Sequence, residues 1–133
     1  MIIREAAVAD GAECGRIVYA AFAAIANQHH FPPDFPSVAV ATDAASMLIA
    51  HPGVHGLVAE EDGRIVGSNF MDQRSPIGGI GPITVDPVAQ NRSIGRSLMQ
   101  AMLDYAMARD LAGIRLVQTA YHNRSLSTHA SAL

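Results

Sequence analysis

The stretch from residue 79 to residue 109 constrains the fold most, because it changes from a strand pattern to a helix pattern across a short polar turn. Residues 80–85 are mostly apolar and include β-branched side chains, and the turn dipeptide Asp86-Pro87 follows them. Polar residues dominate positions 90–97. Beyond them, one apolar face recurs at helical spacing: Ile94, Leu98, Met99, Met102, Leu103 and Ala106. The pattern predicts a strand, a tight turn and a helix.

The polar segment 90–97 has the composition of an anion-binding turn. The first turn of a helix leaves backbone N–H groups without intrahelical partners and carries the positive end of the helix dipole, so phosphate oxygens bind there. Gly95 and the serines allow close approach to the backbone, and Arg92 and Arg96 add positive charge. The segment has neither the Lys-Ser/Thr of a P-loop nor a G-x-G-x-x-G pattern. It therefore predicts a phosphate-binding turn of another kind.

Two motifs together resemble a known family. Val85-Asp86-Pro87 followed by Gln90-x-x-Ser93-x-Gly95 is similar to the acetyl-CoA motif of the GNAT N-acetyltransferase superfamily. Ser93 stands where the family usually has its first Gly, and a positive φ would cost more there than with Gly. The downstream segment 121–127 resembles the later family segment in which an Asn, here Asn123, opens a helix beside the pantetheine arm. The resemblance extends from residue 1 to about residue 127.

The resemblance implies a set of residues that bind acetyl-CoA. The backbone of the strand end would hold the pantetheine arm, amides of the turn would bind the pyrophosphate, and the Asn123 side chain would face the arm. The N–H of Val85 would donate to the oxyanion of the transition state. The residues implied for the cofactor are Ile83, Thr84, Val85, Gln90, Asn91, Arg92, Ser93, Ile94, Gly95, Arg96, Ser97 and Asn123.

Proton transfer is less defined by the sequence. Many relatives place a Tyr in the last helix as general acid, whereas here that position falls near Thr128 or His129. We predict His129 and Tyr121 as the candidate general acids. The alternative for His129 is an ordinary surface histidine, and the alternative for Tyr121 is a side chain that packs at the end of a strand. A base is suggested only by elimination, as Asp72, Glu60 or His30, unless water relays the proton or the amine is already partly neutral.

The histidines and the cysteine do not predict a metal site. His51 and His55 have the spacing of a helical pair, but Pro52 and Gly53 between them disrupt a shared helical face. The single cysteine, Cys14, stands among Ala and Ile at helical spacing, which favours a buried thiol over a nucleophile and excludes an internal disulfide. We expect no metal.

Length and charge restrict the class of protein. A chain of 133 residues, half of them hydrophobic, predicts one domain over residues 1–133 with a real core. A net charge of −3 gives no general attraction to nucleic acid or to an anionic membrane. Neither a signal peptide nor a run of about 20 apolar residues is evident, so a cytoplasmic protein is expected.

The remaining elements predict an α/β fold, a mixed sheet with helices on both faces. We expect strands at residues 2–6, 54–60, 64–71 and 114–120, with a hairpin turn at 61–63 and a bulge or close approach at Gly67. Helices are expected from an N-cap at Asp10 to residue 27, from Thr42 or Asp43 to residue 51, and from Asn123 onward. The Pro- and His-rich segment 28–36 is either a substrate wall or a packed cover over the core.

The expected GNAT-like fold is short at its C-terminal end. Family members usually add two further strands, which this sequence lacks, so strand 114–120 would have an open edge that another chain could cover in a homodimer. Two functions remain from the sequence. One is acetyl transfer from acetyl-CoA to a primary amine of a small molecule or protein; the other is a CoA-binding regulatory module with impaired catalysis, or a truncated relative.

Overall fold

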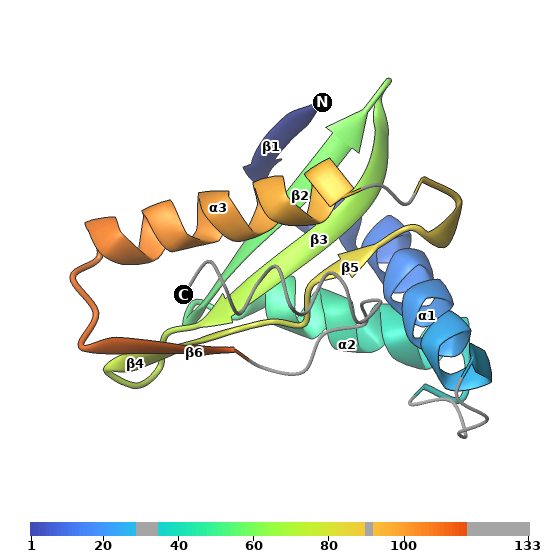
Figure 1. The fold of residues 1–133 in the computed structure, drawn as a ribbon. Coiled ribbons are helices and arrows are strands. Elements are labelled where there is room, and N and C mark those ends of the chain that lie inside the picture. Colours follow the sequence, from blue (N-terminus) through green and yellow to red (C-terminus); the bar gives the residue numbers. More distant parts are fainter. Residues whose placement is uncertain (29–34, 90–91, 117–133) are drawn as a thin grey trace.

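The computed structural model describes residues 1–28, 35–89 and 92–116 as a mixed α/β fold (Figure 1). The elements are β1 (Ile2–Glu5), the 3-10 turn η1 (Val8–Asp10), α1 (Gly11–Gln28), α2 (Val38–Ala50), β2 (Val54–Glu61), β3 (Arg64–Asp72), β4 (Ile77–Ile80), β5 (Thr84–Val85), the 3-10 turn η2 (Pro87–Ala89), α3 (Arg92–Ala108) and β6 (Gly113–Leu116). Residues 117–120 of the last expected strand, and the helix expected from Asn123, lie outside the described residues.

The strands form one mixed sheet, as predicted. Its order is β1-β2-β3-β4-β6, with β5 also paired to β3. Every described pair of neighbouring strands is antiparallel except β4 and β6, which run parallel from Ile77 opposite Gly113 to Ile80 opposite Leu116. The α3 helix connects β5 to β6, which lets β6 run parallel to β4.

The β2–β3 hairpin confirms two predictions. Its two-residue turn, Asp62-Gly63, has positive φ at both residues (51° and 76°), the geometry that matches the twist of the flanking strands. At Gly67 the register with β2 shifts by one residue, because Ala59 pairs with Gly67 and Glu60 with Ile65. A Cβ on Gly67 would lie 2.9 Å from Leu98 Cδ1 and 3.0 Å from the Thr84 carbonyl oxygen. Gly67 is therefore both next to a bulge and at a close approach.

The strand expected at residues 80–85 is wrong as a single element, because it is interrupted between β4 and β5. Ile80 pairs with Met71 and Thr84 pairs with Ser68, so four steps on one strand match three on β3. One extra residue is thus accommodated near the cis Gly81–Pro82 bond. Pro82 cannot donate to a ladder, so an interruption at this position follows from the covalent structure.

The helix starts differ from the predictions. Asp10 does precede α1, but its carboxylate accepts from the Ala7 N–H (2.7 Å) and from Arg4 rather than from the first turn of α1. The second helix begins earlier than expected, since Ser37 is its N-cap and accepts from the Val40 N–H at 3.2 Å. Thr42 and Asp43, predicted as caps, are interior to that helix. The two helices thus include residues that the sequence left in loops.

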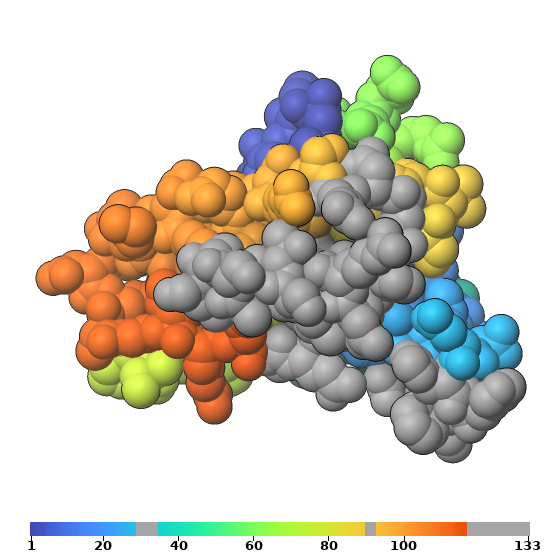
Figure 2. All heavy atoms as spheres, in the orientation of Figure 1, coloured from blue at the N-terminus to red at the C-terminus, as the bar shows by residue number. Residues whose placement is uncertain are grey.

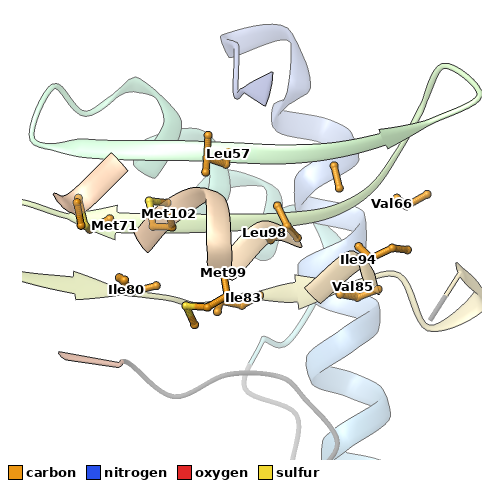
Figure 3. Close-up of a cluster of buried hydrophobic side chains, with 12 residues drawn as sticks. Leu57, Val66, Met71, Ile80, Ile83, Val85, Ile94, Leu98, Met99 and Met102 are labelled. Atoms are coloured by element: carbon orange, nitrogen blue, oxygen red, sulfur yellow. The ribbon is translucent and has the colours of Figure 1, made fainter. Parts of the chain in front are cut away.

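Helices cover both faces of the sheet, which confirms the predicted fold class. α3 lies on one face, and α1 and α2 lie on the other (Figure 1). In the space-filling view, α3 in orange lies beside β6 and β4 at one side of the molecule (Figure 2). Among the described residues, the core under α3 is the larger of the two. Figure 3 shows its side chains converging between helix and strands. The buried members of this core are Leu57, Ala59, Val66, Met71, Ile80, Ile83, Val85, Ile94, Leu98, Met99, Met102 and Ala106.

No described helix is long and apolar enough to cross a bilayer.

Candidate functional site

The main-chain N–H and C=O of Val85 on β5 point away from the neighbouring strand β3. Asp86 N–H donates to the Val66 carbonyl at 2.8 Å, and hydrogen-bonded pairs alternate with non-hydrogen-bonded pairs along an antiparallel ladder. Val85, paired with Gly67, is therefore in a non-hydrogen-bonded pair, with its N–H and C=O directed away from β3. The described pairing of β6 ends at Leu116 opposite Ile80, before this point. Val85 thus offers one donor and one acceptor on that side of β5.

The side chains of β5 are buried on both faces of the sheet. Thr84 is fully buried, and its hydroxyl lies 2.9 Å from that of Ser68 on β3, one donating to the other. Val85 is 2% exposed and packs in the core under α3. Ile83, just before β5, is fully buried in the same core. Any ligand at β5 would consequently contact its main chain.

The expected polar turn is largely helical, because α3 begins at Arg92. Ser93, predicted as a turn residue, lies in the first turn of the helix, where no positive φ is needed and the change from Gly costs little. Ser93 and Arg96 are exposed, whereas Gly95 is buried. Ile94 is fully buried, so its side chain belongs to the core and only its main chain could face a ligand. The exposed part of this turn therefore presents a helix N-terminus with Arg96 beside it.

The turn between β5 and α3 is built on Asp86. Its carboxylate accepts from the Val88 N–H at 3.1 Å, and its carbonyl accepts from the Ala89 N–H at 3.0 Å. From α1, both terminal guanidinium nitrogens of Arg16 lie 3.4 Å from Asp86 Oδ2. Sequence reasoning missed Arg16, which is separated from Asp86 by 70 positions. Only the folded topology brings α1 to this turn.

Asn69 connects the centre of β3 to α3. Its Nδ2 donates to the Leu98 carbonyl at 3.2 Å, while its Oδ1 has no partner among the described residues. Asn69 is fully buried, and along β3 it lies between Ser68, which pairs with Thr84, and Phe70. The bond helps to set the height of α3 over the sheet. No sequence pattern singled out this residue.

The structure does not bring the two carboxylate candidates for the base, Asp72 and Glu60, to Val85. Asp72 pairs with Gly79 at the other end of β3, roughly 17 Å along the strand from the rung of Val85. Arg74 donates to Asp72 and lowers the pKa of that carboxyl to about 2, which does not suit a base at neutral pH. Glu60 accepts from Arg4 at 3.0 Å on the β1–β2 pair. Neither carboxylate is placed for proton transfer at β5.

Several predicted site residues lie outside the described residues. These are His30, Gln90, Asn91, Tyr121, Asn123 and His129. Of Arg92 only the main chain, the first residue of α3, is described. In the part of the chain that is described, no three His, Cys, Asp or Glu side chains are grouped as a metal would require.

The strand, turn and helix agree with what comparison with known proteins finds. The sequence model of the acetyltransferase (GNAT) family matches residues 18–131, which is most of the chain. The chain belongs to the GNAT acetyltransferase family. Its fold is the one expected from the two sequence motifs.

Several solved structures share this fold at low sequence identity. A variant of the BH1408 protein of Bacillus halodurans gives a TM-score of 0.80 at 20% identity, over 99% of this chain and 91% of that chain. A ribosomal-protein-alanine N-acetyltransferase of Brucella melitensis biovar Abortus gives 0.72 at 17% identity, over 99% and 91%. A GNAT family acetyltransferase of Brucella melitensis in complex with acetyl-CoA gives 0.68 at 24% identity, over 92% and 79%. A search of the curated proteins found no significant match.

Proposed function

We propose that the protein transfers an acetyl group from acetyl-CoA to a primary amine of a small molecule or a protein, by direct transfer in a ternary complex. The observation that carries the proposal is the continuity of β5, its turn and α3 in a GNAT family member. The main chain of Val85 points away from β3, and the first turn of α3 begins seven residues later, at Arg92. A solved GNAT structure holding acetyl-CoA supports the choice of donor.

In the proposed site, two parts of the chain bind the acetyl-CoA donor. The amide groups of the pantetheine arm would pair with the N–H and C=O of Val85, as an added strand pairs with a sheet edge. The diphosphate would bind at the first turn of α3, where the helix dipole is positive and Arg96 is exposed. The two parts together would fix the thioester at the end of β5.

The chemistry requires an oxyanion donor and a path for one proton. The amine nitrogen attacks the thioester carbonyl carbon, the C–N bond forms and the C–S bond breaks. The proton lost by the amine balances the proton gained by the thiolate. We assign the Val85 N–H to the carbonyl oxygen as negative charge develops on it. Tyr121 and His129 stay the proposed proton donors to the thiolate.

The test begins with calorimetric titration of acetyl-CoA into the protein and into two charge-reversed variants. Arg96→Glu places a negative charge at the first turn of α3, and the matched control Arg64→Glu makes the same change at an exposed site on the β2–β3 hairpin. We expect Arg96→Glu to weaken acetyl-CoA binding about tenfold, because it replaces a charge that attracts the diphosphate with one that repels it. The control variant should bind with an affinity close to that of the wild type. Equal affinity for acetyl-CoA in all three proteins would contradict the proposal that the diphosphate binds at α3.

Thiol release in the presence of amines then separates catalysis from binding. A disulfide reagent that reports free CoA is suitable, because the sole cysteine, Cys14, is fully buried and burial raises its pKa to about 12. Release that depends on an added amine supports the transferase. Tight binding without release across small amines and amine-bearing peptides supports the CoA-binding module instead. Absence of acetyl-CoA binding by folded protein would contradict both.

A further inference from the structure

Asp86 is a buried anion at the start of the connection from β5 to α3, the helix whose first turn we propose to bind a diphosphate. Only 3% of the residue is exposed, and its surroundings fix four of its atoms. The N–H donates to Val66, the C=O accepts from Ala89, one carboxylate oxygen accepts from Val88, and the other faces Arg16. Asp86 therefore connects β3, α1 and the η2 turn at a single position.

The Asp86 charge is unfavourable for the proposed ligand. An ionised carboxylate removed from water is costly unless it is paired, and a diphosphate bound in the following turn adds negative charge nearby. Among the side chains that the structure describes, the cation paired with Asp86 is Arg16. Its two terminal nitrogens share one oxygen at 3.4 Å, and 47% of its side chain is exposed. The pair is thus long, and its cationic side remains in contact with solvent.

We propose that Arg16 is a positioning residue for the diphosphate turn. By pairing with Asp86, it holds the turn in the shape that accepts the diphosphate, and it offsets the buried negative charge that would repel this ligand. This inference rests on the proposed function. It places a determinant of donor binding on α1, across the sheet from α3, and it requires no contact between Arg16 and the ligand.

The test compares donors with and without phosphate groups. Arg16→Ala, Arg16→Lys and the matched control Arg64→Ala are titrated with acetyl-CoA, with ADP and with S-acetylpantetheine, which carries no phosphate. We expect Arg16→Ala to weaken acetyl-CoA and ADP about fivefold and to leave S-acetylpantetheine within error of wild type. Arg16→Lys should recover most of the affinity, since it keeps the charge, and Arg64→Ala should bind all three as wild type does.

A second variant separates charge from shape. Asp86→Asn keeps an oxygen to accept from the Val88 N–H but removes the negative charge. In this background, Arg16→Ala should cost less affinity for acetyl-CoA than in the wild type, because no buried anion is left uncompensated. Equal costs in the two backgrounds would mean that Arg16 does not act through the Asp86 charge, and would overturn the proposal.

The remaining outcomes are also decisive. Arg16→Ala with wild-type affinity for every ligand would overturn the inference while leaving the proposed function intact. An equal loss for S-acetylpantetheine, with a lower melting temperature, would show a general structural role and would overturn it as well. Wild-type protein that binds neither acetyl-CoA nor ADP would refute the proposed function, and the inference with it.

Discussion

The two faces of the sheet are covered by helices in different ways. Under α3, the core is filled by long side chains, among them three fully or nearly fully buried methionines, Met71, Met99 and Met102. On the opposite face, α1 and α2 approach each other through small residues. A Cβ on Gly15 would overlap the main chain and hydroxyl of Thr42, and one on Gly11 would lie 2.5 Å from the Ser46 hydroxyl.

The two faces differ in how far their packing can adjust to a mutation. Flexible thioether side chains can repack around a small change, whereas two backbones in contact cannot. The helix that carries the proposed diphosphate turn is thus held by adaptable packing, together with polar bonds from Asn69 and from Gln73. The helix that carries Arg16 is held against α2 by close contact. We expect mutations on the two faces to differ accordingly in cost.

The largest effect should come from Gly15→Val. The new side chain would overlap Thr42 at its Cα, and a backbone atom cannot rotate away, so the two helices would have to separate. We expect the free energy of unfolding to fall by at least about 3 kcal/mol, measured by urea denaturation.

Gly113→Ala is the control for adding a Cβ to a glycine. There the Cβ would lie 3.7 Å from Ile77 Cγ1, an ordinary contact, and the change should be nearly neutral. A Gly15 variant as stable as this control would mean that α1 and α2 are not in close contact.

A smaller loss is expected on the other face from Leu98→Ala. Leu98 is fully buried beneath α3, and its truncation leaves a cavity between the helix and the sheet. We expect a cost of about 2–3 kcal/mol, toward the low end for a buried leucine because neighbouring methionines can move into the space. Met107→Ala, on the same helix with 78% exposure, should change stability little. A cost above that of Gly15→Val would reverse the comparison.

The sequence predicted the α3 face better than the α1–α2 face, for physical reasons. A face packed by long side chains leaves a periodic apolar pattern, and Ile94, Leu98 and Met102 predicted this helix directly. Close contact between helices depends on small residues, which carry little hydrophobic signal. The start of α2 was also missed, because Ser37 is followed by Val-Ala-Val, in which the two β-branched valines do not favour a helix strongly.

The proposed site was predicted in part. The motif around Asp86 and Gly95 identified the turn and the family, and the family match bears the resemblance out. Pro82 carried a signal for the interruption between β4 and β5, since proline is confined to edges and bulges of sheets, but the apolar run around it was read as one strand. The Arg16–Asp86 pair had no signal, because a contact across 70 positions depends on the whole topology.

The α3 face also ends in an aromatic stack that should respond to pH. The imidazole of His55 on β2 is parallel to the ring of Tyr105 on α3, with centroids 3.6 Å apart, and Gln73 donates to the Tyr105 hydroxyl at 3.0 Å. Burial lowers the pKa of His55; Glu5 raises that pKa by a smaller amount, and Arg109 lowers it further. The neutral imidazole is therefore the form that the folded protein favours.

The smallest predicted effect is the pH dependence that this stack produces. Because the pKa of His55 is lower in the folded state, the unfolded chain takes up the proton first as the pH falls. The full stability is present above the ordinary histidine pKa of about 6.5 and declines below it. His55→Phe keeps an aromatic ring beside Tyr105 but cannot be protonated, so its stability should fall less between about pH 7.5 and pH 5.

Urea denaturation at a series of pH values measures this difference, with His51→Asn as the control for loss of a histidine that keeps an acceptor for the Gly53 N–H. The window avoids the carboxyl groups of Asp10 and Asp72, whose pKa values are lowered by their arginine partners and which lose their contribution only at more acidic pH. Parallel curves for wild type and His55→Phe would mean that the imidazole is accessible to water in the folded state. The stack would then be a surface contact, and the ordered packing of the α3 face would end before Tyr105.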